Sequence, residues 1–101
     1  MEEMKRLENG EGLSFALIGD IDAGKSDTMY AEFLTAYETE PANVTFECEA
    51  LDFIDSTTLG TFVKILKRVK TDGYTLKLKG LQARIKKLFV ICALDTIMEI
   101  E

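Results

Sequence analysis

Histidine and tryptophan are absent from the 101 residues of this chain, and proline occurs only once. Without histidine the chain cannot form a Ser-His-Asp or Cys-His catalytic arrangement. It also lacks a ligand that most zinc sites use. The commonest hydrolytic sites and most zinc sites are therefore excluded by composition.

Cysteines and long apolar runs are also scarce. Cys48 and Cys92 each lie in an apolar stretch, which favours two buried free thiols over a disulfide. The N-terminal residues 1–6 lack the apolar core of a signal peptide. No run approaches the roughly 18 apolar residues that span a membrane. We therefore expect a cytoplasmic protein that does not associate with a membrane.

The net charge is −6, and the charges are divided unevenly. Residues 1–55 hold 14 acidic and 3 basic side chains, whereas residues 56–101 hold 4 acidic and 9 basic ones. A negative net charge disfavours general nucleic-acid binding, so we expect no nucleic-acid partner. This uneven division of charge either orients a charged protein partner or is neutralised by ion pairs within the fold.

Strand and helix patterns alternate along the chain, whose length suits one compact domain over residues 1–101. Alternation of this kind predicts the α/β class with a mostly parallel sheet of four to five strands. The predicted strands cover residues 13–21, 43–50, 74–79 and 97–100, with a weaker one at 4–7. The predicted helices run from 26 or 27 to 38, from the stretch 55–58 to about 70, and from 82 to about 93.

Charged side chains occupy one face of two predicted strands. Glu47 and Glu49 alternate with apolar residues on one strand, and Lys77 and Lys79 do so on another. Parallel strands covered on both faces are apolar throughout, so these strands predict helices mainly on one side of the sheet. If the strands are neighbours, the opposite charges are expected to pair across the open face.

Residues 19–26 satisfy the G-x-x-x-x-G-K-[ST] pattern of a phosphate-binding loop between a strand and a helix. Asp20 and Asp22 would place two carboxylates in the phosphate cradle, which opposes binding by charge repulsion. The chain is also short for such an enzyme and leaves no element to recognise a base. Nucleotide binding is therefore a lower-ranked hypothesis, and a tight turn shaped by Gly19 and Gly24 is the alternative.

A second motif, residues 55–58, places three hydroxyl side chains behind a carboxylate at a predicted helix start. A hydroxyl at Ser56 would cap free N–H groups of the helix. A phosphate there would gain from the same groups and add about −1.5 to −2 charge. Because Asp55 and the nearby Asp20 or Asp22 already make this edge negative, the charge would change the surface more than the fold. From these residues alone, a switch and a plain helix cap both remain open.

Residues 51–60 resemble the signature of STAS-domain anti-sigma-factor antagonists, in which Asp-Ser-(Ser or Thr)-Gly-Leu-Gly opens a helix. Residues 19–22 look like the family's Gly-Glu-Leu-Asp turn, and residues 84–89 are similar to its basic helix ending in Leu-Phe. Thr58 stands where the family usually has glycine, a change that could affect the approach of a partner. The pair Gly24-Lys25 has no counterpart in the family pattern.

The resemblance implies a STAS domain that binds proteins and is not an enzyme, without catalytic residues, metal or cofactor. Ser56 would accept a phosphate from an anti-sigma-factor serine kinase, whose capture by the unphosphorylated form frees a sigma factor. A PP2C-type phosphatase would reset the switch. The alternative within the family is a scaffold that is not phosphorylated. The implied partner-binding residues are Asp20, Asp22, Asp55, Thr57, Thr58 and Leu59.

Overall fold

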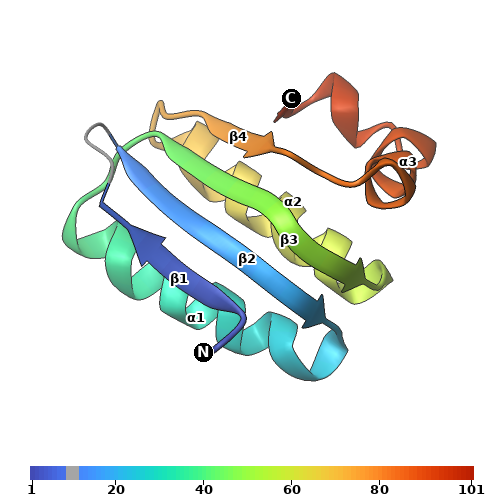
Figure 1. The fold of residues 1–101 in the computed structure, drawn as a ribbon. Coiled ribbons are helices and arrows are strands. Elements are labelled where there is room, and N and C mark those ends of the chain that lie inside the picture. Colours follow the sequence, from blue (N-terminus) through green and yellow to red (C-terminus); the bar gives the residue numbers. More distant parts are fainter. Residues whose placement is uncertain (9–11) are drawn as a thin grey trace.

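The computed structural model describes residues 1–8 and 12–101 of the chain, which fold into one layer of strands and one layer of helices (Figure 1). Strands and helices alternate along most of the chain, as the sequence predicts. In chain order the elements are β1 (Met4–Leu7), β2 (Leu13–Ile21), α1 (Ala23–Thr39), β3 (Val44–Ile54), α2 (Ser56–Thr71), β4 (Leu76–Lys79), α3 (Ala83–Ile91), the 3-10 turn η1 (Leu94–Thr96) and β5 (Glu99–Ile100).

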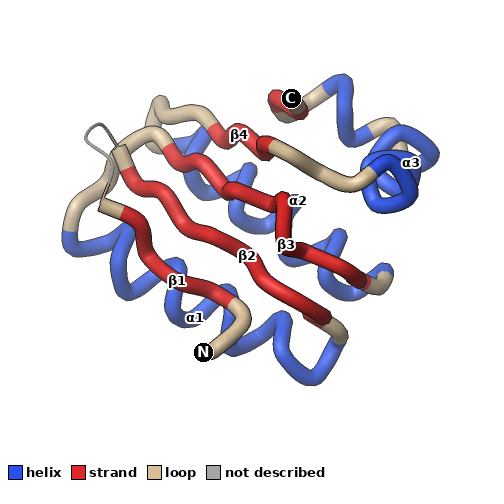
Figure 2. Tube along the Cα trace, viewed as in Figure 1, coloured by secondary structure: helices blue, strands red, loops and turns tan. Residues whose placement is uncertain are grey.

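The strands lie in the order β1-β2-β3-β4-β5. β2, β3, β4 and β5 are parallel to one another, and β1 is antiparallel to β2. Figure 2 shows the long helices α1 and α2 behind one face of the sheet, with the other face uncovered. The predicted α/β class, mostly parallel sheet and one-sided helix layer are therefore confirmed.

Aromatic side chains form the centre of the core between the sheet and the two long helices. Phe46 of β3 lies 5.6 Å, centroid to centroid, from both Phe15 of β2 and Phe62 of α2. Phe33 of α1 contacts Phe15 and Phe46 and is fully buried. The two helices are thereby held over β2 and β3, and their N-termini follow the C-terminal ends of these strands.

Two predicted boundaries in the first half of the chain are wrong. α1 begins at Ala23 rather than at residue 26 or 27, because the side chain of Asp22 caps it by accepting from the Gly24 amide. Ser26, which we expected as a cap, is fully buried in the helix. β3 continues past residue 50 to Ile54, because register shifts against β2 let it keep pairing.

The C-terminal region also differs from its prediction. α3 packs against the core through Ile85 and Phe89 alone. Leu88 and Cys92, which we expected to face inward, are exposed, as is Ala83. The buried residues Ile85 and Phe89 are four residues apart, so the helix presents only this narrow side to the core, and Cys92 lies beyond its last residue. Residues 94–96 form the 3-10 turn, so the predicted last strand shrinks to β5.

Cys48 is buried as expected, and burial raises the pKa of its thiol to about 12. Neither cysteine forms a disulfide, in agreement with the expectation of free thiols.

The charged side chains of the open face pair differently from the prediction. The register places Glu47 opposite Lys79 on adjacent strands. Among residues 1–8 and 12–101, however, the ion pairs of this face join Lys77 to Glu99 at 3.5 Å and to Glu101 at 3.0 Å. β5 lies on the other side of β4, and Glu99 of β5 and the next glutamate, Glu101, pair with Lys77 instead.

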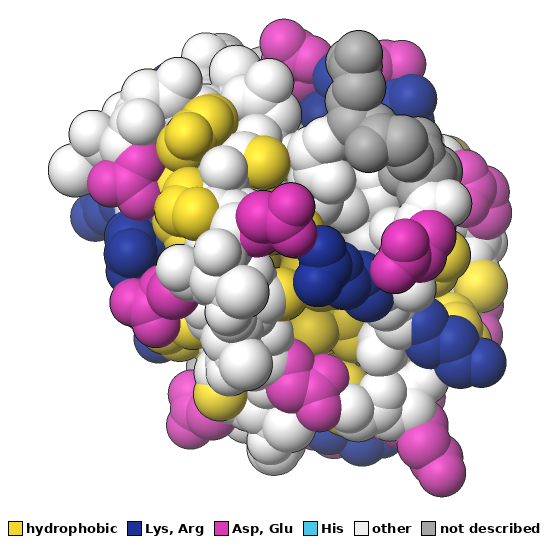
Figure 3. All heavy atoms as spheres, turned by 90° about the vertical axis from the view of Figure 1, so that its left-hand side faces the viewer, with side chains coloured by type: hydrophobic (Ala, Val, Ile, Leu, Met, Phe, Trp, Pro, Cys, Tyr) yellow, Lys and Arg dark blue, Asp and Glu magenta, His cyan; other side chains and the backbone are white. Residues whose placement is uncertain are grey.

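Other ion pairs connect the acidic first half of the chain with nearby cations. Arg6 lies 3.5 Å from Glu40, and Arg68 of the basic second half lies 3.4 Å from Glu38. The face in Figure 3 accordingly shows acidic and basic side chains interspersed around small hydrophobic areas rather than one field of a single sign. Ion pairs within the fold therefore neutralise part of the acidic charge of the first half of the chain.

Candidate functional site

The N-termini of α1 and α2 meet at one edge of the sheet, where the parallel strands β2 and β3 end. We call residues 20–23 and 55–59 the helix-start edge. An aspartate caps each helix: Asp22 caps α1, and Asp55 caps α2. A carboxylate at each cap satisfies backbone N–H groups that have no partner within their helix.

The carboxylate of Asp55 joins the two helix starts. One oxygen accepts from the Ala23 amide of α1 at 2.8 Å. The other accepts from the Thr58 amide at 3.0 Å and is 3.1 Å from the Thr58 hydroxyl. The hydrogen bond from the Thr58 amide is the main reason that the pKa of Asp55 is lowered. At neutral pH the group is therefore a carboxylate that serves both helices.

The three hydroxyl residues that follow Asp55 have different environments. Ser56 and Thr57 are exposed. Thr58 is fully buried, and its hydroxyl donates to the Ile21 carbonyl at the end of β2 over 2.7 Å. Within the described ranges, the Ser56 hydroxyl forms no hydrogen bond. The expectation that Ser56 caps the helix is therefore wrong: Asp55 is the cap, and the Ser56 side chain is left to solvent.

The other predicted edge residues also separate by exposure. Asp20 and Asp22 are exposed and Asp55 is half-buried, so their carboxylates contribute to the surface. Leu59 is only 8% exposed and belongs to the core. Thr58 and Leu59 can thus support the helix-start edge from the protein interior, but they offer little surface to a partner.

The phosphate-loop pattern at residues 19–26 folds into a capped helix start. The amides of Lys25 and Ser26 each donate to the Asp22 carbonyl at 3.0 Å, and the Gly24 amide donates to the Asp22 carboxylate. The Lys25 ammonium lies 3.1 Å from a Glu3 carboxylate oxygen and 3.3 Å from the Asp20 carbonyl. These donors are the ones that a bound phosphate would need, so the loop does not offer a phosphate cradle.

An apolar surface that the sequence analysis missed lies beside the helix-start edge. Phe53 is 49% exposed and Leu88 is 37% exposed, and together they line a cleft of about 150 Å³. The adjacent residues Phe53 and Ile54 are both apolar, yet neighbouring strand residues point to opposite faces. That signal could have identified one of them as an exposed apolar side chain.

Polar side chains at the start of α3 hold the end of β3 beside this cleft. Gln82 donates to the Leu51 carbonyl at 3.0 Å and to the Asp52 carboxylate at 3.2 Å. Arg84 donates to the Asp52 carbonyl. β4 pairs with β3 only as far as Glu47, so these side chains bond to carbonyl groups of β3 that lie beyond its pairing with β4.

Neither a metal-binding cluster nor a membrane-spanning helix occurs in the described ranges, 1–8 and 12–101. Histidine, cysteine, aspartate and glutamate do not gather there in any group of three or more that could hold a metal ion. Within the same ranges no helix combines the length and the apolar character needed to cross a membrane.

Comparison with known proteins shows which family this chain matches. Residues 3–101 match the family described as STAS domain. The chain is 33% identical over 98 residues to the anti-sigma-B factor antagonist of Bacillus subtilis (strain 168), covering 97% of this chain and 87% of the relative.

Two solved structures have the same fold. The anti-sigma factor antagonist SpoIIAA in its unphosphorylated form matches 97% of this chain and 86% of its own, with a TM-score of 0.77 and 16% identity. The Bacillus cell fate determinant SpoIIAA in its phosphorylated form matches 97% and 90%, with a TM-score of 0.72 and 19% identity. At these identities, the likeness concerns the fold alone.

Proposed function

Because this chain belongs to the STAS domain family, we propose that it acts as an anti-sigma-factor antagonist, a protein-binding module without catalytic activity. In this proposal the unphosphorylated form captures an anti-sigma-factor kinase in the cytoplasm and so frees a sigma factor. The 33% identity to the anti-sigma-B factor antagonist of Bacillus subtilis supports this assignment over almost the whole chain.

The observation that carries the proposed switch is the environment of Ser56. Its hydroxyl is exposed at the first position of α2, while its neighbours Asp55 and Thr58 make the bonds that hold the helix start. A kinase can therefore reach the oxygen without opening the fold. In the proposed transfer, the Ser56 oxygen bonds to the γ-phosphorus of ATP, ADP leaves, and a group of the kinase takes the hydroxyl proton.

The phosphate would act through its charge rather than by capping the helix. Asp55 already accepts the Thr58 and Ala23 amides, so the strongest donors of the edge are in use. A group carrying about −1.5 to −2 charge would stand beside the carboxylates of Asp22 and Asp55. It would repel an acidic or tightly fitting partner surface while leaving the domain folded. Hydrolysis by a PP2C-type phosphatase would restore binding.

Exposed polar and apolar groups would share the proposed interface. Asp20, Asp22 and Thr57 supply polar contacts around the acceptor. Phe53 and Leu88 supply an apolar anchor at one end of the edge, because exposed large side chains in a cleft are typical of interaction surfaces. Thr58 and Leu59, which the resemblance implied as contacts, would act from within the protein.

The test uses Ser56→Ala and Ser56→Asp with the anti-sigma-B factor of Bacillus subtilis as the probe, in a pull-down and an ATP-dependent phosphorylation assay read by intact mass. Ser56→Ala should bind as wild type does and gain no phosphoryl group. Ser56→Asp should bind at least about tenfold more weakly, because it mimics part of the added charge. Thr71→Ala, which removes an exposed hydroxyl at the opposite end of α2, is the control and should behave as wild type.

Equal binding by the two Ser56 variants would contradict the switch. Binding without any gain in mass would favour the scaffold that is not phosphorylated. Titration with labelled ATP tests the remaining alternative, and saturable binding that Lys25→Ala abolishes would reinstate the nucleotide-binding loop.

A further inference from the structure

Thr58 stands where the family pattern has glycine, and its side chain is turned into the protein. It is fully buried, and its hydroxyl donates to the Ile21 carbonyl over 2.7 Å. The bond crosses from the first turn of α2 to the last residue of β2, 37 residues away in sequence. A glycine at this position has no atom that could form it.

The bond from Thr58 and the bond from Asp55 form a reciprocal arrangement. Thr58 holds Ile21, the residue before Asp22, and Asp55 holds Ala23, the residue after it. In turn, Asp55 and Thr58 are the residues on either side of the Ser56-Thr57 pair. We call these two contacts the clasp. Asp22 therefore lies between the two residues that the clasp holds on α1 and β2. The Ser56-Thr57 pair lies between the two residues that hold them.

We propose that Thr58 is a positioning residue that sets the spacing between Asp22 and the Ser56 acceptor, the two parts of the edge that a partner would contact together. The inference rests on the proposed function, because it concerns how that partner is recognised. A spacing fixed before binding costs less conformational entropy when the partner docks, so the clasp strengthens capture without touching the partner.

Burial of Thr58 has a second consequence. Its hydroxyl is sealed inside the protein, so phosphorylation at this helix start is limited to Ser56 and Thr57. Because Thr58 is fully buried, it can affect a partner only through the residues that it holds in place.

Three variants isolate the clasp. Thr58→Val removes the hydroxyl and keeps the shape, and Thr58→Ser keeps the hydroxyl and should rescue the effect. Thr61→Val is the matched control, because Thr61 is also buried in α2 but its hydroxyl bonds to the Thr57 carbonyl of the same helix rather than to β2.

The first readout needs no partner and follows amide hydrogen exchange in the full chain. Thr58→Val should speed exchange of the Ala23 and Thr58 amides about fivefold, the effect of losing one hydrogen bond. Thr58→Ser should restore wild-type rates, and Thr61→Val should leave these two amides unchanged. Equal rates in Thr58→Val and Thr61→Val would overturn the clasp.

The second readout measures phosphorylation by the anti-sigma-B factor of Bacillus subtilis. Thr58→Val should raise KM about fivefold with kcat little changed, because the clasp acts on capture rather than on chemistry. An unchanged KM alongside faster exchange would overturn the positioning role. If wild type is neither bound nor phosphorylated, the proposed function fails and the positioning role falls with it, while the exchange rates still show whether the clasp forms.

Discussion

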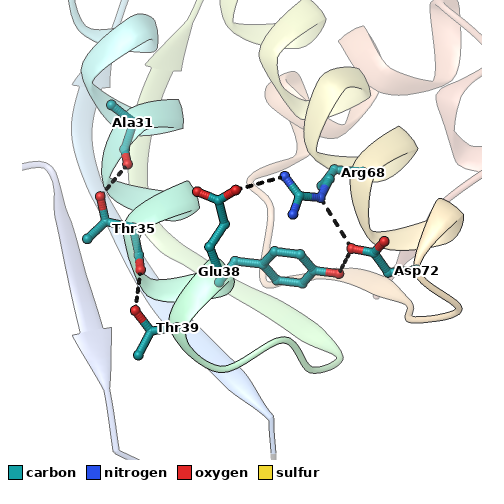
Figure 4. Close-up of polar contacts among 7 residues, drawn as sticks. Ala31, Thr35, Glu38, Thr39, Arg68 and Asp72 are labelled. Atoms are coloured by element: carbon teal, nitrogen blue, oxygen red, sulfur yellow. Dashed lines mark hydrogen bonds and ion pairs between the residues drawn. The ribbon is translucent and has the colours of Figure 1, made fainter.

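α1 and α2 are tied together at both ends, and an aspartate is the acceptor in each tie. At the helix-start edge, Asp55 accepts the backbone amides of Ala23 and Thr58. At the opposite end, Asp72 follows the last residue of α2 and accepts from long side chains (Figure 4). Both ties use an aspartate carboxylate, but one accepts from backbone amides and the other from side chains.

The far tie is closed to solvent on its inner side. The Tyr37 hydroxyl of α1 donates to Asp72 at 2.7 Å, and this bond is the main reason that the pKa of Asp72 is lowered. Arg68 lies 3.2 Å from the same oxygen of Asp72 and 3.4 Å from Glu38. Figure 4 shows Arg68 between these two carboxylates. Every member bonds to another member, so this end serves the fold.

The helix-start edge differs because its tie uses backbone amides and a buried hydroxyl. Those groups hold the helices from within, and the side chains of Ser56 and Thr57 are left outside the tie. The comparison indicates that an exposed hydroxyl can lie next to a structural tie that does not use it. The predictions below test that division.

The largest effect is expected from Tyr37→Ala at the far tie. Tyr37 is fully buried and stacks on Phe33 with ring centroids 5.3 Å apart. Deleting the ring should lower the free energy of unfolding by about 4 kcal/mol, as for other buried aromatics. Urea unfolding measures it, with the half-buried Tyr30→Ala of the same helix as control. Equal losses in the two variants would show that the far tie has no special share in stability.

Tyr37→Phe keeps the ring and removes only the hydrogen bond to Asp72. The free energy of unfolding should fall by about 1.5 kcal/mol at neutral pH, as for a bond to a charged group. The pKa of Asp72 is lowered in the fold, so the stability that it contributes is present above its ordinary pKa and is lost as pH falls through the folded value. The difference between variant and wild type should therefore shrink at about pH 2, and a difference that persists there would contradict an ionic tie.

A smaller loss of stability, absent at neutral pH, should appear in alkaline solution, where the Tyr37 hydroxyl ionises. Burial, together with the bond to Asp72, raises the pKa of Tyr37 to about 12 from its ordinary 10.0. A raised folded pKa means that the stability is complete below pH 10 and is lost as pH rises toward 12. The buried Cys48 thiol acts with the same sign. Tyrosinate absorbance should show one late-titrating tyrosine that Tyr37→Phe removes; titration of all tyrosines together would refute the closed tie.

The sequence predicted the helix-start edge better than the far tie, for a physical reason. Local signals define a helix start, because capping residues and an apolar stripe lie within a few residues of each other. Residues 55–58 therefore marked the start of α2 correctly, although the cap is Asp55 and not Ser56. The same local rule misplaced α1, since Asp22, Ser26 and Asp27 can all cap. Only the bond to the Gly24 amide identifies Asp22 as the cap.

Contacts between distant residues had no local signal. Tyr37 and Asp72 are 35 residues apart, and nothing near either one indicates the other. The run of three hydroxyls likewise does not reveal which one faces inward, because the Thr58 contact with Ile21 depends on where β2 ends. The exposure of Leu88 was missed because a helix of nine residues has too few turns to fix its buried side by periodicity.

The smallest effect is expected at Ser56, and it bears most directly on the comparison. Ser56→Ala and Ser56→Asp should each change the free energy of unfolding by less than about 0.5 kcal/mol, because the side chain is exposed and outside the tie. Thr58→Val, which removes a buried hydrogen bond two residues away, is the control and should cost about 1 kcal/mol. If Ser56→Asp instead cost as much as Thr58→Val in urea unfolding, the added charge would act by loosening α2. A phosphate would then change the partner surface only through the fold, and the separation between tie and acceptor would be lost.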